Sequence, residues 1–170
     1  MMTVQNDMND KSTKALLAKY AAPVPRYTSY PTAPHFTSDV DAAIYRDWLS
    51  ALPADEPLSL YLHVPFCDIL CWYCGCATKQ TRRYDPIAQY VEPLLAEIEA
   101  VGSLVATRPP VTHMHWGGGS PNPLSAGDIG RLNDALRKYF NFADDAEFAV
   151  EIDPRRLDSD VVAAFAAAGV

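Results

Sequence analysis

Apolar residues recur along the chain at two different periods, and these periods predict three strands that alternate with helices. Residues 58–64 carry leucine or valine at every second position, as a half-buried strand does. Residues 111–116 predict a second strand and residues 147–153 a third. After each strand, apolar residues recur three or four positions apart, which indicates a helix. These helices are predicted over residues 85–102, 125–140 and 158–169.

Residues at the helix ends support these boundaries. Asp85 followed by Pro86 predicts a helix that begins with Asp85 as its N-cap, and Gly102 is a plausible end for that helix. Ser125 with Asp128 three positions later has the spacing of a capping box.

Residues 1–57 have a different pattern and predict an N-terminal arm with short helices. One helix is predicted to begin near Ser12, and a surface helix is predicted over residues 41–52. Between them, residues 23–36 contain four prolines, which exclude helix and favour an extended path, either over a surface or as a lid. Residues 58–170 form the second predicted part of the chain.

The order of strands and helices predicts an α/β fold. Helical crossovers imply parallel strands with right-handed connections. Three βα units do not close a barrel, so we expect residues 58–170 to be the incomplete N-terminal part of one. Ligands collect at the carboxyl ends of such strands. A cysteine-rich segment, the glycines 117–119, and Glu151 with Asp153 all fall at these ends, which indicates one shared site.

Composition and charge restrict the function. The 170 residues carry a formal net charge of −7, which disfavours binding to nucleic acid or to an anionic membrane surface. The apolar stretches are too short to span a bilayer, and residues 1–14 lack the apolar core of a signal peptide. We therefore expect a cytoplasmic protein whose thiols remain reduced.

All four cysteines lie within ten residues, at Cys67, Cys71, Cys74 and Cys76. Their C-x3-C-x2-C-x-C spacing indicates a metal or cluster site. Structural zinc sites usually draw two separated pairs of ligands, and no second pair exists here. Iron–sulfur clusters are held by closely spaced thiolates on one loop, so this pattern favours a cluster over zinc.

The first three cysteines, which follow a strand and have Tyr73 before the third, resemble the signature of the radical S-adenosylmethionine (SAM) superfamily. This resemblance implies a partial (βα) barrel of the radical SAM type. It implies a [4Fe-4S] cluster whose irons are held by Cys67, Cys71 and Cys74, with one iron open for SAM. Cys76 is then not a ligand.

Further motifs occur in residues 26–32, 61–67, 74–76, 115–121 and 151–155. Together with the cysteines, these motifs resemble the oxygen-independent coproporphyrinogen III oxidase family, and the resemblance extends from about residue 23 to residue 170. Ser120 stands where threonine is common in that family, a change that keeps the hydroxyl.

The resemblance implies a reaction and its partners. The reaction is the oxidative decarboxylation of two propionates of coproporphyrinogen III to vinyl groups, which gives protoporphyrinogen IX in haem biosynthesis. A 5′-deoxyadenosyl radical generated from SAM at the [4Fe-4S] cluster abstracts hydrogen from the β-carbon of a propionate, and loss of carbon dioxide and one electron then leaves the vinyl group. The family implies two SAM molecules per active site, an electron donor for the cluster, and a monomer at full length.

Residue roles follow from the same resemblance. Catalytic roles are implied for Cys76 and His63. Gly119 and Ser120 resemble contacts to a second SAM. The contacts to the cluster-bound SAM are implied for Tyr61, Tyr73, Gly118 and Glu151. Residues 117–119 could equally form an ordinary turn, and Glu151 could be a solvated acid at a strand end.

Two alternatives remain open. The first is a haem chaperone of the same superfamily, although such relatives typically lack the ending Cys74-Gly75-Cys76 and the Arg26–Thr32 motif. The second is an inactive truncated fragment, because the third strand would be left as an open edge. Within the oxidase interpretation, Arg26 could meet a substrate propionate.

Overall fold

The computed structural model describes residues 11–21 and 32–170, which belong to two compact units, Met1–Asp39 and Val40–Val170. The first unit contains helix α1 (Lys11–Tyr20), which confirms the helix predicted near Ser12. Arg26 and most of the proline-rich arm lie outside the described residues.

The expectation that prolines exclude helix throughout residues 23–36 is wrong at one point. Residues Ala33–His35 form a single 3-10 turn, η1, in which the backbone N–H of His35 donates to the carbonyl of Thr32 at 2.8 Å. Proline is tolerated there, because the first turn of a helix does not use the N–H that proline lacks.

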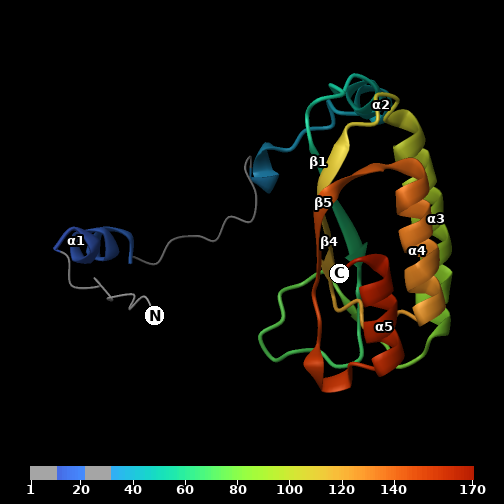
Figure 1. The fold of residues 1–170 in the computed structure, drawn as a ribbon. Helices are drawn as coiled ribbons and strands as arrows, with labels where there is room; N and C mark the ends of the chain where they lie inside the picture. Colours follow the sequence, from blue (N-terminus) through green and yellow to red (C-terminus); the bar gives the residue numbers. More distant parts are fainter. Residues whose placement is uncertain (1–10, 22–31) are drawn as a thin grey trace, which may run out of the picture. The chain divides into compact units, whose positions relative to one another are not determined.

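The second unit is built on a three-stranded parallel sheet, which confirms the predicted α/β fold (Figure 1). The strands are β1 (Leu58–Val64), β4 (Pro110–Gly118) and β5 (Asn141–Val150), with β4 in the centre. Helices α3 (Asp85–Leu104), α4 (Ala126–Tyr139) and α5 (Ser159–Ala168) pack side by side on one face of this sheet.

Alternation along the strands places the core between the sheet and these helices. In β1, Leu62 and Val64 are buried. Tyr61, which alternates with these apolar positions along the strand, is exposed. The indole of Trp116 is fully buried on β4 and contacts the rings of Phe148 and Phe165, with centroid distances of 5.4 and 5.9 Å. These aromatic contacts join β4 to β5 and α5.

Helix starts agree with the sequence in most places. The predicted surface helix is α2 (Ala42–Ser50), in which no residue is buried and Asp41 is the N-cap. The Ser125 side chain accepts a hydrogen bond from the backbone of Asp128 at the start of α4. Asp158 caps α5 in the same way.

Asp85 is not an N-cap, contrary to the prediction. Tyr84 occupies that position, and Asp85 lies inside the first turn of α3. Its carboxylate pairs with the guanidinium of Arg83 at 2.9 Å, so a local ion pair replaces the predicted cap.

The third strand also differs from the predicted range. It begins at Asn141 and ends at Val150, so that Glu151 follows the strand and Asp153 lies beyond it. Asp153 instead caps the short 3-10 helix η2 (Pro154–Arg156), because its side chain accepts from the backbone N–H of Arg155.

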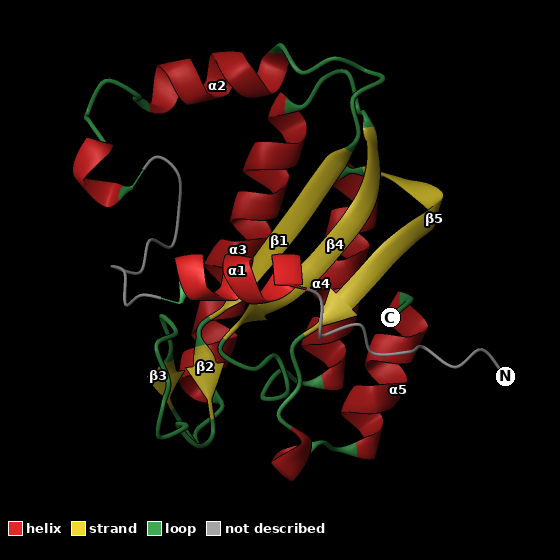
Figure 2. Cartoon of the chain, turned by 90° about the vertical axis from the view of Figure 1, so that its left-hand side faces the viewer, coloured by secondary structure: helices red, strands yellow, loops and turns green. Residues whose placement is uncertain are grey.

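Two short strands escaped prediction. β2 (Phe66–Cys67) and β3 (Lys79–Gln80) pair in parallel next to the main sheet, at the lower left of Figure 2. Each has only two residues, too few to produce a period along the sequence. Their pairing closes the loop of residues 68–78, which carries three of the four cysteines.

Gly102 does not end α3, contrary to the prediction, because the helix continues to Leu104. A Cβ atom at Gly102 would lie 2.5 Å from Cβ of Tyr139 in α4. Glycine at this position therefore permits α3 and α4 to approach closely. In the part of the chain that the structure describes, no helix is long and apolar enough to cross a membrane.

We predict that Gly102→Ala lowers the free energy of unfolding by about 1–3 kcal/mol, the usual cost of overpacking a tight contact. Gly130→Ala in α4 is the matched control, because nothing lies within 4 Å of the added methyl group. This control should gain about 0.5–1 kcal/mol from the better helix propensity of alanine. Urea denaturation measures both, and equal effects of the two substitutions would contradict the packing role.

Candidate functional site

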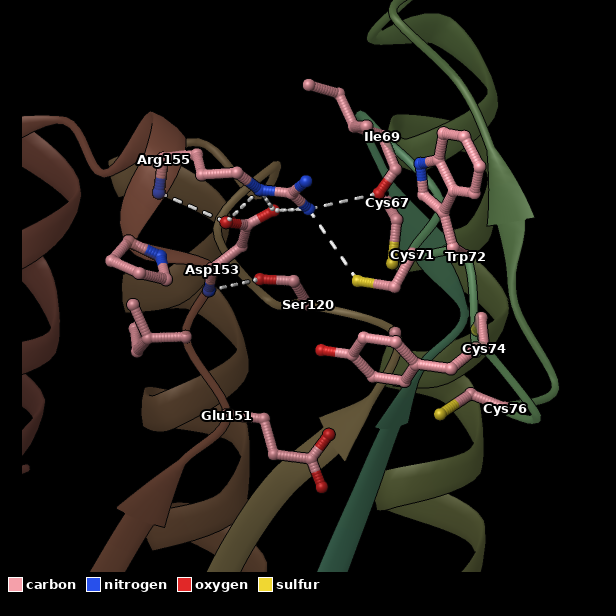
Figure 3. A pocket seen from close by; sticks show the side chains of 14 residues that line it. Cys67, Ile69, Cys71, Trp72, Cys74, Cys76, Ser120, Glu151, Asp153 and Arg155 are labelled. Atoms are coloured by element: carbon pink, nitrogen blue, oxygen red, sulfur yellow. Dashed lines mark hydrogen bonds and ion pairs between the residues drawn. The ribbon is translucent and has the colours of Figure 1, made fainter.

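A cavity of about 530 Å³ lies beyond the carboxyl ends of the three parallel strands (Figure 3). Three segments form its wall: the cysteine loop after β2, the turn after β4, and the segment after β5. The structure therefore brings together the three motifs that the sequence placed at strand ends. The predicted site residues that line it are Cys67, Cys71, Tyr73, Cys74, Cys76, Gly119, Ser120 and Glu151.

All four cysteines are free thiols that line this cavity. Cys67 and Cys71 are half-buried, and Cys74 and Cys76 are exposed. A backbone hydrogen bond of 3.1 Å from Cys74 to Cys71 turns the loop, and Trp72 projects fully into solvent. Figure 3 shows the sulfur atoms of Cys67 and Cys71 near Arg155, with Trp72 turned away from it.

Among residues 11–21 and 32–170, no three His, Cys, Asp or Glu side chains are arranged around a single metal ion. The donor set nevertheless fits an iron–sulfur cluster, since clusters are held by cysteine thiolates and all four free thiols face one cavity. Thiolates that bind different irons of one cluster do not converge on a single point.

The Cys76 thiol has a pKa above its usual value. The charge of the neighbouring Cys74 thiolate is the main cause, followed by a side-chain hydrogen bond with Cys74, by burial, and by the charges of Glu151 and Cys67. Cys76 therefore retains its proton more readily than an isolated cysteine does.

Both carboxylate oxygens of Glu151 are held in place. One faces Nε2 of His115 at 3.2 Å, and the other accepts a hydrogen bond from the backbone N–H of Gly118 at 3.2 Å. A Cβ atom at Gly117 would lie 2.6 Å from the Glu151 carboxyl group. The carboxylate thus packs directly on the glycine backbone, which only glycine at position 117 permits.

The remaining two glycines are also constrained by close neighbours. Gly118 has a φ of +107°, and a Cβ atom there would lie 2.3 Å from the His63 ring. A Cβ atom at Gly119 would lie 2.4 Å from the carbonyl oxygen of Phe66. The glycine segment is therefore more than a turn, because each residue lets the backbone approach a different neighbour.

Tyr61, His63 and Gly118 do not line the cavity. Nε2 of His63 lies 3.0 Å from the carbonyl oxygen of Ala77, which can only accept, so Nε2 carries the proton. Nδ1 then accepts from the hydroxyl of Tyr61 at 3.1 Å. His63 thus connects β1 to the end of the cysteine loop, and its catalytic role stays a prediction.

The Tyr61 hydroxyl has a raised pKa. Partial loss of water around the hydroxyl is the main cause, although the side chain as a whole is exposed, and the charges of Glu151 and Cys76 add to it. The Tyr61 ring also stacks on the ring of His115 with a centroid distance of 5.8 Å. Tyr61 therefore lies close to the charged groups of the site even though it does not line the cavity.

Sequence reasoning missed a polar network between the turn after β4 and the segment after β5. The Ser120 hydroxyl donates to Oδ1 of Asn122 at 2.5 Å and accepts from the backbone N–H of Asp153 at 3.1 Å. The Asn122 amide donates to the carbonyl of Asp153 at 2.7 Å. Buried Ser120 is thus tied to the segment after β5, and nothing in the spacing of these residues indicated it.

Arg155 is the second residue without a sequence-based role. Its guanidinium is paired with Asp153, with Nε at 2.8 and 3.0 Å from the two carboxylate oxygens and Nη2 at 2.6 Å from one of them. Nη2 also reaches the carbonyl of Ile69 at 3.4 Å and Sγ of Cys71 at 3.7 Å. The only sequence signal was its place in the motif of residues 151–155.

This fold and this cavity define the class of protein. The model of the radical SAM superfamily matches residues 61–170, and the chain belongs to that superfamily. The three parallel βα units are accordingly part of a radical SAM barrel.

Among individual proteins, the chain is similar to oxygen-independent coproporphyrinogen III oxidases. The chain is 50% identical over 147 residues to the oxygen-independent coproporphyrinogen III oxidase of Bradyrhizobium diazoefficiens, covering 86% of this chain and 33% of the relative. It is 44% identical over 163 residues to the enzyme of the same name from Paracoccus denitrificans, covering 96% of this chain and 36% of that relative. The chain therefore spans about a third of the length of these relatives.

A solved structure of a coproporphyrinogen III oxidase is also similar to the chain. The structure of coproporphyrinogen III oxidase (HemN) from Escherichia coli, described as a radical SAM enzyme, matches with a TM-score of 0.77 and 40% identity. The match covers 91% of this chain and 34% of that structure.

The ion pair between Asp153 and Arg155 predicts how the stability of the fold depends on pH. The guanidinium of Arg155 holds the pKa of Asp153 below its ordinary value of 3.8. A lowered pKa means that the stabilisation is complete above the ordinary value and is lost as the pH falls through the folded-state value.

We therefore expect Asp153→Asn to lower the free energy of unfolding by a constant amount above about pH 5 and by progressively less below it. Urea denaturation at a series of pH values measures this difference. Asp145→Asn, at an exposed carboxylate of β5, is the control. A difference that is the same at pH 3 and pH 7 would contradict the ion pair as its source.

Proposed function

We propose that this chain contributes the cluster- and SAM-binding part of an oxygen-independent coproporphyrinogen III oxidase. The observation that carries the proposal is the meeting of four free thiols, the glycine segment and Glu151 around one cavity. The names of the similar proteins supply the reaction, and the geometry supplies residues suited to it.

Cys67, Cys71 and Cys74 would hold a [4Fe-4S] cluster. When bound, such a cluster supplies the electron that starts SAM-dependent radical chemistry. Cys76, a free and exposed thiol that lines the same cavity, would stand beside the ligands without binding iron and would take part in turnover.

Glu151 would orient the SAM molecule bound at the cluster. Each of its oxygens accepts one hydrogen bond in the structure and retains further lone pairs. An oriented carboxylate at a strand end can accept bonds from ribose hydroxyls or from an ammonium group. Tyr73 lines the same cavity and offers an exposed aromatic face. Tyr61 and Gly118 do not line the cavity and would support Glu151, Gly118 through its backbone hydrogen bond and Tyr61 through its position near the carboxylate.

Gly119 and Ser120 would contact a second SAM. The Ser120 hydroxyl already donates to Asn122 and accepts from Asp153, so it can accept one further hydrogen bond but cannot donate another. The lack of a side chain at Gly119 allows a ligand to approach the backbone closely. This pair would therefore recognise a ligand donor group rather than an acceptor.

The substrate and partners follow from the same proposal. Each of two propionates of coproporphyrinogen III would lose a hydrogen atom from its β-carbon to a 5′-deoxyadenosyl radical, then carbon dioxide and one electron, the electron passing to an acceptor, and would become a vinyl group. An electron donor would reduce the cluster, and a cytoplasmic location would keep the cysteines as thiols.

The cluster assignment predicts different outcomes for two cysteine variants. After anaerobic reconstitution, Cys67→Ala should lose most of its bound iron and sulfide, because a ligand is missing. Cys76→Ser should retain the iron and sulfide content of the unmodified chain. Iron and sulfide assays with circular dichroism as a folding control measure this difference. Loss of iron in Cys76→Ser would show that the three-ligand assignment is wrong.

A chimera tests the reaction itself. The chain replaces the matching segment of the Paracoccus denitrificans relative, to which it is 44% identical. With SAM, a chemical reductant and no oxygen, we expect this chimera to convert coproporphyrinogen III to protoporphyrinogen IX, detected by chromatography. The Cys76→Ser chimera should bind the cluster and form no product. If the chimera with the unmodified chain folds and holds the cluster but gives no product, the proposed function is contradicted.

A further inference from the structure

Two hydrogen-bond donors outside the set of cysteines point at sulfur atoms of candidate ligands. The hydroxyl of Thr78 donates to Sγ of Cys67 at 3.4 Å. Nη2 of Arg155 donates to Sγ of Cys71 at 3.7 Å, as the dashed line in Figure 3 shows. Two of the three proposed ligands therefore already have a partner for the sulfur.

The approach of Arg155 is fixed from outside the cysteine loop. Asp153 binds its guanidinium through both carboxylate oxygens. The backbone of Asp153 is in turn held by Ser120 and Asn122. The guanidinium is therefore positioned by the segment after β5 and only then reaches across the cavity to Cys71.

The hydroxyl of Thr78 is fixed by packing. A Cβ atom at Gly119 would lie 2.6 Å from Oγ1 of Thr78, so this hydroxyl lies directly against the glycine backbone. The backbone N–H of Thr78 donates to the carbonyl of Cys76 at 2.9 Å. The preceding carbonyl, that of Ala77, is bound by His63. Thr78 is thus held from both the loop and the sheet.

Resting on the proposed function, we propose that Thr78 and Arg155 are positioning residues that donate hydrogen bonds to the Cys67 and Cys71 thiolates and thereby raise the reduction potential of the cluster. A donor at a ligating sulfur withdraws charge and stabilises the reduced cluster, which is the more negative form. The cationic donor Arg155 adds a favourable charge to the same effect.

The test measures the reduction potential of the reconstituted chain, by titration with a chemical reductant and electron paramagnetic resonance. Thr78→Val keeps the shape and removes the donor, and Arg155→Met keeps length and removes the charge. Each of these two variants should have a more negative reduction potential than the unmodified chain. At a fixed solution potential, the ratio of reduced to oxidised cluster should therefore fall at least about threefold. Thr78→Ser should restore the potential, and Arg155→Lys should restore part of it.

Two matched controls separate the sulfur contacts from general effects. Arg156→Met removes the same charge from the same short helix, but Arg156 faces Asp68 at 3.9 Å rather than a thiol. Thr81→Val removes a hydroxyl that bonds the backbone of Arg83. Both should leave the potential unchanged.

The outcomes distinguish this inference from the proposed function. If the unmodified chain binds the cluster but Thr78→Val and Arg155→Met match their controls, the inference is wrong and the proposed function stands. If the unmodified chain binds no cluster, both are wrong. If Arg155→Met alone fails to take up iron, its reduction potential has no readout, and the two Thr78 variants test the inference. It stands if Thr78→Val has a more negative potential than Thr78→Ser, and it is wrong if the two potentials are equal.

Discussion

The close packing of the glycine segment 117–119 against its neighbours is the contact on which the site depends. It forms the carboxyl end of β4, the central strand, with Gly119 as the first residue beyond it, so its backbone lies between the loops that leave β1 and β5. Glu151 packs on one glycine, the His63 ring on the next, and the backbone of Phe66 on the third. Any side chain in this segment would separate parts of the site, since a Cβ atom has no room at any of the three positions.

Hydrogen bonds and an ion pair then fix the orientation of the side chains around the glycine segment. Ser120, at the end of the glycine segment, is bonded to Asp153, and Asp153 holds Arg155 over the cysteine loop. On the other side, His63 binds the carbonyl of Ala77 at the end of that loop. Hydrogen bonds thus attach the cysteine loop to β1 and to the segment after β5. A loop held in this way can present several thiols to one cavity without regular secondary structure of its own.

The sequence predicted most of the fold because the strands and helices have clear periods. β1 matches the predicted range at both ends, and α5 begins and ends within one residue of the predicted range 158–169. In two places the sequence did not predict the local structure, because a contact distant in sequence decided it. Gly102 is a contact with α4 rather than a helix end, and β2 and β3 exist only because they pair with each other. Neither contact produces a local signal.

The sequence by itself determined the chemistry of this protein: four thiols in one loop, a glycine segment and a carboxylate, each after a strand. Their order and spacing also indicated the family, to which the match over residues 61–170 assigns the chain. Only the tertiary structure decided that Arg155 and Thr78 reach the cysteine sulfurs and that His63 supports the loop instead of lining the cavity. The physical reason is that side-chain hydrogen bonds depend on distances across the parallel sheet, and spacing along the chain does not specify those distances.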